Sequence, residues 1–195
     1  MLAATLGITY STETNYMPTQ SAPSSCPLCG GGPVAFRRTL TTDRSYDLYG
    51  CAQCDAWFWW PMKNPGASWY EHDERYAGRN KDPLLQPNWN HKKVISFLRP
   101  RTGKVLDVGC GTGNFLAHAR ARGWDPYGID FDTDAVDVAH TVFKLPNVEV
   151  SDIASYAQRH AGERFDLVTF FDVFEHIDNH SEFVGHVSSL LKDDG

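Results

Sequence analysis

A glycine-rich turn directly after a short apolar segment constrains the fold of this chain more than any other feature. The apolar segment is Lys104–Val108, and the turn is Gly109–Gly113, with the sequence G-C-G-T-G. An apolar run of this length that ends in glycines is typical of a buried parallel strand. Glycines at alternate positions let the backbone turn tightly and let a ligand approach closer than a Cβ would permit. The sequence therefore predicts a strand, a ligand-binding turn and then a helix.

The spacing of these glycines separates the turn from two common phosphate-binding turns. A dinucleotide-binding turn has the pattern G-x-G-x-x-G, and Asn114 occupies the place of its last glycine. A P-loop would continue with Gly-Lys-Ser/Thr, which does not follow here. The pattern G-x-G-x-G, with Asp107 two residues before the first glycine, suits a ligand that has no pyrophosphate.

Acidic residues recur at the ends of the next two predicted strands. Asp130 follows the strand Pro126–Ile129, and Asp152 with Ile153 follows the strand Val148–Val150. Open α/β sheets bind ligands beyond the C-terminal ends of their strands. There, Asp130 can accept hydrogen bonds from two ribose hydroxyls, and Asp152 with Ile153 can contact an adenine edge and face. Each aspartate alone is typical of a helix cap or a turn, but their recurrence in order favours a binding site.

Residues from Arg101 onward alternate between apolar runs and amphipathic segments. Strands that alternate with helices of this length predict right-handed βαβ crossovers and a doubly wound parallel sheet, here with four strands. The other predicted elements are the helices Asn114–Arg122, Thr133–Phe143, Ile153–His160 and His180–Leu191 and the strand Phe165–Phe171.

Three motifs together resemble class I S-adenosylmethionine (SAM) methyltransferases. They are D-V-G-C-G-T-G in the turn, G-I-D at the second strand and F-D-L-V-T-F-F-D-V-F-E-H-I around the fourth. The similarity covers Lys104–Gly195 and is greatest to the small-molecule branch that includes the ubiquinone-biosynthesis O-methyltransferases. It implies a Rossmann-like α/β fold, SAM as the methyl donor and a small-molecule acceptor.

The resemblance also implies which residues contact SAM. The implied cofactor-binding residues are Asp107, Gly109 and Gly111 at the methionine end with Gly113 in the same turn, Asp130 at the ribose, Asp152 and Ile153 at the adenine, and Phe131 packed on the adenine.

Ionisable residues follow the fourth strand, at the edge implied to face the methyl group. Methyl transfer from a sulfonium is an in-line displacement, so the protein mainly aligns the nucleophile and excludes water. A hydroxyl acceptor also benefits from a general base. His176 is the candidate base, with Asp172 beside it, because an unperturbed imidazole titrates near neutrality. The alternatives are that Glu175 and His176 only pack and cap after the strand, or that this cluster binds a divalent metal, as in some relatives.

Four of the five cysteines form two C-x-x-C pairs that predict a zinc ribbon. Cys26 and Cys29 are separated from Cys51 and Cys54 by 21 residues, close to the usual interval. Four thiolates close a tetrahedral site, which is structural rather than catalytic. Iron in a rubredoxin-like site is the alternative metal. Cys110 is predicted to be a small core residue within the glycine turn.

The aromatic segment Trp57–Trp60 follows the second pair of cysteines. We expect an edge strand of the ribbon that docks on the neighbouring domain; the alternative is an aromatic wall for a planar or sugar-ring acceptor. A connector with a helix at Trp89–Leu98 follows. This order of parts also resembles methyltransferases of nucleotide-sugar and polysaccharide pathways and some zinc-ribbon ribosomal-RNA methyltransferases. A net charge of -6 argues against nucleic acid.

Composition is typical of a soluble globular protein, with 42% hydrophobic and 22% charged residues. No apolar run approaches the ~20 residues of a transmembrane helix, and the N-terminus lacks the basic region of a secretory signal. These features favour a cytoplasmic protein without membrane contact. The predicted parts are a disordered tail at 1–25, in which Met17 is an alternative start, a zinc ribbon at 26–60, the connector at 61–100 and the SAM-binding domain at 101–195.

The chain ends at Gly195, where the resemblance implies three more strands. We therefore expect the fourth strand to lie at a sheet border and the last helix to lack part of its packing surface. On this interpretation Phe183, Val184, Val187 and Leu190 lose their partners, and the chain is marginally stable or self-associating. A catalytically inactive fragment, or an inactive zinc-ribbon protein that serves in partner recognition, is the alternative to an active enzyme.

Overall fold

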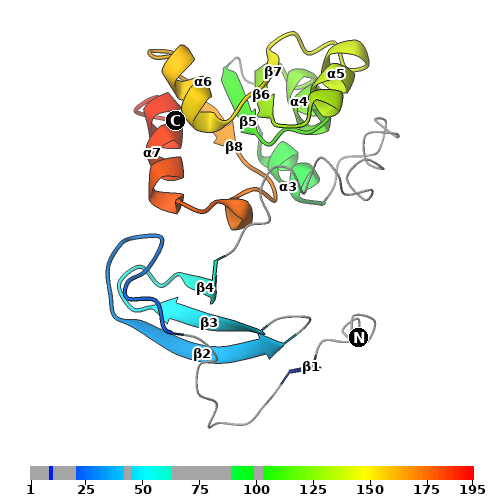
Figure 1. The fold of residues 1–195 in the computed structure, drawn as a ribbon. Helices are drawn as coiled ribbons and strands as arrows, with labels where there is room; N and C mark the ends of the chain where they lie inside the picture. Colours follow the sequence, from blue (N-terminus) through cyan, green and yellow to red (C-terminus); the bar gives the residue numbers. More distant parts are fainter. Residues whose placement is uncertain (1–8, 11–20, 42–44, 63–88, 99–102) are drawn as a thin grey trace. The chain divides into compact units, whose positions relative to one another are not determined.

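The computed structural model describes residues 9–10, 21–41, 45–62, 89–98 and 103–195 of the chain (Figure 1). Its backbone divides into two compact units, residues 1–64 with 178–181 and residues 65–177 with 182–195. Most of the predicted connector lies outside the described residues. No described helix combines the length and the apolar character that crossing a membrane requires.

The first unit contains an antiparallel sheet of four strands in the order β1-β2-β3-β4. The strands are β1 (Thr9–Tyr10), β2 (Val34–Thr41), β3 (Ser45–Cys51) and β4 (Trp57–Trp60). The aromatic segment is therefore an edge strand of the described sheet, as its composition predicts. In β1, Thr9 and Tyr10 pair with Thr41 and Leu40 of β2, and the other residues of the predicted tail up to residue 20 lie outside the described residues.

The second unit contains a parallel sheet in the order β7-β6-β5-β8. The strands are β5 (Lys104–Val108), β6 (Asp125–Asp130), β7 (Val148–Val150) and β8 (Leu167–Thr169). Chain order runs outward from β5 to β7 and then returns to β8 on the other side, so the predicted doubly wound topology is confirmed. The order changes direction between β5 and β8, and β8 is a border strand of the described sheet, as predicted.

Strand β8 is shorter than the predicted Phe165–Phe171. Phe165 pairs instead with the residues after the last helix, because its N–H donates to Leu190 O at 2.8 Å and its carbonyl accepts from Lys192 N at 3.0 Å. Asp166 N donates to Lys104 O at 3.0 Å and joins this region to the start of β5. The predicted strand is thus divided between two partners: Leu167–Thr169 pairs with β5, and Phe165 pairs with Leu191.

Helices cover both faces of the parallel sheet (Figure 1). Successive side chains of β5 point to opposite faces of the sheet, so Val105 packs in one core and Leu106 in the other. The first core includes side chains of α3, α4 and α5, and the second includes side chains of α6 and α7. The helices are α3 (Trp89–Phe97), α4 (Asn114–Arg120), α5 (Thr133–Thr141), α6 (Ile153–Arg159) and α7 (His180–Leu190), with a 3-10 turn η1 (Phe174–His176).

The packing of α7 corrects one prediction. Phe183, Val187 and Leu190 are buried in the second core, so they do not lack a packing surface. Val184 alone of the four predicted residues is exposed, at 45%. The prediction failed because the apolar side chains of β8 and the segment after it, such as Phe170 and Phe174, supply partners for Phe183.

Candidate functional site

The glycine turn is fixed to the end of β6 by its own backbone. Gly109 N and Cys110 N both donate to Ile129 O, at 2.8 and 3.0 Å. The φ angles of Gly109, Gly111 and Gly113 are 71°, 52° and 80°, a region that side chains with a Cβ rarely adopt. The alternating glycines therefore allow the chain to leave β5 and enter α4 within five residues.

The three glycines differ in what surrounds them. A Cβ at Gly109 would collide with Val173 Cγ2, and one at Gly113 would lie 2.5 Å from Leu145 Cδ1. A Cβ at Gly111 would meet nothing within 4 Å among the described residues. Gly109 and Gly113 thus serve close packing, whereas Gly111 borders open space at the carboxyl edge of the sheet.

The carboxylate of Asp130 is held against this open part of the turn. Its Oδ2 accepts a hydrogen bond from Gly111 N at 2.7 Å, and its Oδ1 accepts one from Asp132 N at 2.9 Å. Burial raises the pKa of Asp130, and the N–H groups of Asp132 and Gly111 oppose that rise. Both oxygens are therefore oriented by backbone donors from two different loops.

Asp107 lies at the end of β5 and is 2% exposed. Thr169 Oγ1, on the neighbouring β8, donates to Asp107 Oδ1 at 2.7 Å. Burial raises the pKa of Asp107 to about 8; the hydrogen bond from Thr169 opposes this rise, and the charge of Asp130 adds to it. A cation bound nearby would favour the ionised form of this carboxyl.

Asp152 caps helix α6. Its Oδ1 accepts from Ser155 N and its Oδ2 from Ser155 Oγ, both at 2.7 Å, and these bonds lower the pKa of Asp152. The adjacent Ile153 is buried in the second core. Phe131, after β6, is 59% exposed. The structure thus gives Asp152 and Ile153 structural partners, while Phe131 presents a ring to solvent near the ends of β6 and β7.

The segment after β8 lies beside the glycine turn. Val173 is the side chain that a Cβ at Gly109 would meet, and Asp172 precedes it with a φ of 53°. His176 ends η1, where its N–H donates to Val173 O at 2.9 Å. Asp172 is therefore at the carboxyl edge of the sheet, and His176 follows one turn later.

A histidine from α3 joins this edge, although no sequence motif indicates it. The ring of His91 lies 4.6 Å from that of Phe171 and 5.7 Å from that of Phe115, measured between centroids. Burial lowers the pKa of His91, the charge of Asp172 opposes this, and His118 adds to it. The helix was expected at Trp89–Leu98, but no motif around His91 indicates its partners, which are distant in sequence.

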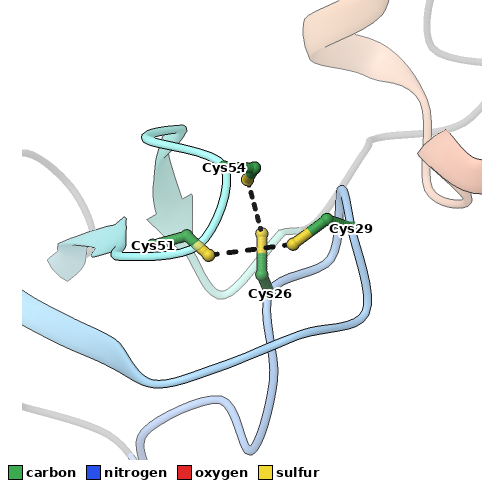
Figure 2. Close-up of side chains that lie close together, drawn as sticks. All are labelled: Cys26, Cys29, Cys51 and Cys54. Atoms are coloured by element: carbon green, nitrogen blue, oxygen red, sulfur yellow. Dashed lines mark hydrogen bonds between the residues drawn. The ribbon is translucent and has the colours of Figure 1, made fainter.

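The four paired cysteines converge in the first unit (Figure 2). All four sulfur atoms lie within 4.8 Å of one another, with Cys26 Sγ 3.7 Å from Cys54 Sγ and Cys29 Sγ 3.8 Å from Cys51 Sγ. Four sulfurs at about 2.3 Å from a central zinc ion are about 3.8 Å apart in a tetrahedron. The donor set therefore fits a tetrahedral metal ion.

The surroundings of the cluster shift the pKa values of two of its thiols in opposite directions. Leu28 N and Gln53 N each donate to the sulfur two residues earlier, at 3.4 Å. The N–H of Cys54, with that of Gln53 and the neighbouring thiols, lowers the pKa of the Cys51 thiol to about 7. The N–H of Ala56 favours the thiolate of Cys54, but burial and the other three thiols raise the pKa of Cys54 to about 12. Cys110 lies outside this cluster and is buried in the core of the second unit, as predicted.

Curated relatives of this chain include ubiquinone-biosynthesis O-methyltransferases. The protein from Proteus mirabilis is 34% identical over 138 residues, which are 69% of this chain and 55% of the relative. The protein from Thiobacillus denitrificans is 35% identical over 58% of this chain and 50% of its own length. The chain thus spans about half the length of the curated relatives it matches.

Solved structures share the fold of the second unit. A TehB-like SAM-dependent methyltransferase from Corynebacterium glutamicum has a TM-score of 0.52 at 26% identity, over 64% of this chain and 69% of that one. The plantazolicin methyltransferase BpumL, solved with a desmethyl analogue and SAH, has a TM-score of 0.54 at 20% identity. It covers 65% of this chain and 52% of its own.

A family model described as a methyltransferase domain matches residues 72–195, which include every described element of the parallel sheet. This match, the doubly wound topology and the glycine turn agree with one another. The chain therefore belongs to the methyltransferase domain family.

Proposed function

We propose that this protein transfers a methyl group from SAM to a hydroxyl group of a small molecule. The observation that carries the proposal is the position of Asp130, whose two oxygens are oriented by Gly111 N and Asp132 N beside Gly111, where the described residues leave open space. A carboxylate so placed suits the two hydroxyls of a ribose. The named activity of the O-methyltransferase relatives supports a hydroxyl as the acceptor group.

Residues at the carboxyl edge of the sheet would hold the methionine end, the ribose and the adenine of SAM. Asp107 offers a buried carboxyl to the cationic methionine end, and Gly111 allows close approach of the ligand to the backbone. Asp130 accepts from the ribose, and Phe131 offers its exposed ring to the adenine. Asp152 already caps α6 and Ile153 is already buried in the second core. Of these two residues we therefore expect only Asp152 to contact the adenine, through the part of its carboxylate that does not face Ser155.

SAM supplies an activated methyl group that leaves a sulfonium, so the chemistry needs little from the protein except alignment and exclusion of water. Asp107 and Asp130 would fix the methionine end and the ribose of the donor. The residues after β8, Asp172 and His176, stand at the same edge of the sheet and face the acceptor side in this proposal.

For the ribbon we propose a structural zinc ion. Cys26, Cys29, Cys51 and Cys54 would occupy all four positions of a tetrahedral ion, which leaves none for a substrate. The ion would join the loop before β2 to the loop between β3 and β4. Zinc in this site stabilises the fold and takes no part in methyl transfer.

A methyl-transfer assay tests the proposed function. The full chain is incubated with tritiated SAM and either catechol or UDP-glucose, and label in the acceptor is counted. We expect label in at least one acceptor, and its loss in Asp130→Ala. Asp125→Ala is the matched control, because Asp125 is exposed at the opposite end of the same strand β6. SAM binding without transfer to either acceptor would support the inactive alternative and contradict the proposal.

A further inference from the structure

We propose that His91 is the general base that takes the proton from the acceptor hydroxyl, and that the charge of Asp172 stabilises the protonated ring. This inference rests on the proposed function and deepens it by assigning the acceptor side of the site. Helix α3, which carries His91, precedes the first strand of the parallel sheet in the chain. The assignment therefore adds a residue from outside the methyltransferase motifs.

Two aromatic contacts place the imidazole at the carboxyl edge. Phe115 lies in the first turn of α4, directly after the glycine turn, and Phe171 comes directly before Asp172. The ring of His91 packs against both, and the rings of Phe115 and Phe171 are themselves 4.9 Å apart. The imidazole is thus fixed between the proposed donor turn and the end of the fourth strand.

The backbone at Asp172 provides a second, independent observation. Its φ of 53° is uncommon for a residue with a side chain, and such conformations gather at functional sites. The strain lies where the chain leaves β8 toward Val173, which packs beside Gly109. Asp172 is therefore held at the same edge as the glycine turn, next to the aromatic residue that contacts His91.

The electrostatic surroundings suit a base. Burial and His118, on α4, lower the pKa of His91, and Asp172 raises it. The net shift is downward, so the imidazole is neutral at physiological pH and can accept a proton. A proton on the ring is then stabilised by the carboxylate of Asp172.

The step balances as one displacement and one proton transfer. A bond forms between the acceptor oxygen and the methyl carbon while the bond from that carbon to sulfur breaks, and its electron pair stays on the sulfur of the product SAH. The O–H proton moves to the imidazole of His91, which becomes an imidazolium beside Asp172. The imidazolium returns its proton to water before the next turnover.

Two phenols of different acidity separate a base from a residue that only packs. Catechol is protonated at neutral pH and needs a base, whereas 4-nitrocatechol is largely ionised. We expect His91→Gln to lower kcat with catechol by about 100-fold, within the usual range for a general base, and to change kcat with 4-nitrocatechol only a few-fold. Asp172→Asn should shift the acidic limb of the pH–rate profile with catechol to lower pH. His186→Gln, in the middle of α7, is the control.

Other outcomes overturn the assignment. Equal losses with both phenols would show that His91 acts through packing alone. A selective loss in His176→Gln, with His91→Gln unchanged, would assign the base to His176. If the unchanged chain binds SAH by calorimetry but methylates neither phenol, His91 is not the base for a phenolic acceptor, whereas label in UDP-glucose would still support the proposed function. Absence of SAH binding would instead reject the proposed function itself.

Discussion

The burial of one residue, Asp107, should affect how the free energy of unfolding of the protein depends on pH. Its carboxyl is buried at the end of β5, and burial raises its pKa to about 8 from an ordinary value of 3.8. In the unfolded chain the same group ionises near pH 4. Between these two values the folded state holds a proton that the unfolded state has lost, so the free energy of unfolding falls as pH rises.

We therefore predict that Asp107→Asn flattens this pH dependence. Between about pH 4 and pH 8, the decline in unfolding free energy should be smaller by at least ~1.4 kcal/mol, the equivalent of one pKa unit. Urea titrations at a series of pH values measure the slope. Asp125→Asn, an exposed aspartate, is the control and should keep the decline of the unchanged chain. An identical slope in both variants would show that Asp107 is ionised throughout.

Individual residues differ in how far the sequence predicts their surroundings. Asp107 and Asp130 were predictable as neighbours, because parallel strands bring their C-terminal ends to one edge. The cap formed by Asp152 was an open alternative in the sequence, and the structure supplies it through Ser155. The contacts of His91 were not predictable, since they join α3 to residues 24 and 80 positions later in the chain.

At the scale of elements, two glycines of the turn have different roles: Gly113 allows close packing, and Gly111 leaves space for a ligand. Gly113→Ala adds a Cβ 2.5 Å from Leu145 Cδ1 at a φ of 80°, so both a collision and backbone strain oppose it. Gly111→Ala meets only the strain, because the space around its Cβ is open among the described residues. The two substitutions are chemically identical and only two positions apart.

We predict opposite dominant effects for this pair. Gly113→Ala should lower the free energy of unfolding by about 2 kcal/mol or more, from strain and overpacking together. Gly111→Ala should cost only about 1 kcal/mol of stability, from strain, and yet weaken SAH binding at least ~10-fold because its Cβ fills the ligand's approach. Thermal melts and calorimetry on both variants measure the two effects. Unchanged SAH affinity in Gly111→Ala would contradict the placement of the ligand.

Element types were more predictable than element limits. The alternation of apolar runs and amphipathic segments predicted each described helix and strand of the parallel sheet. Strand β8 begins later than predicted, at Leu167, because Phe165 pairs with Leu191 after the end of α7, a contact that no local pattern contains. The same long-range packing buries Phe183, Val187 and Leu190, which local reasoning left without partners.

At the scale of the molecule, we expect the first unit to depend on its cysteine cluster for its stability. Its apolar core is small: the buried members are Cys26, Tyr49, Cys51 and Phe58, so two of the proposed metal ligands are also core residues. Small units of this kind commonly need a metal to fold. The four sulfurs were predictable from the C-x-x-C spacing alone, and their mutual distances fit that prediction.

We predict about one zinc ion per chain after purification under reducing conditions. The double variant Cys51→Ser, Cys54→Ser should lose the metal and the folded ribbon, whereas Cys110→Ala should keep the metal because Cys110 lies outside the cluster. Elemental analysis gives the stoichiometry, and chelator titration followed by circular dichroism reports the unfolding. Full metal occupancy in the double variant, or no zinc and no iron in the unchanged protein, would refute the site.

Binding of SAH to the full chain, measured by isothermal titration calorimetry, tests the central claim most directly. The carboxylate of Asp130 accepts backbone hydrogen bonds at the end of β6, beside the open space at Gly111. We predict that the unchanged chain binds one SAH and that Asp130→Ala weakens binding by about 1.5–3 kcal/mol, the usual range for hydrogen bonds to a charged group. Asp125→Ala should bind as the unchanged chain does. Equal SAH affinity in Asp130→Ala and the unchanged chain would contradict the account.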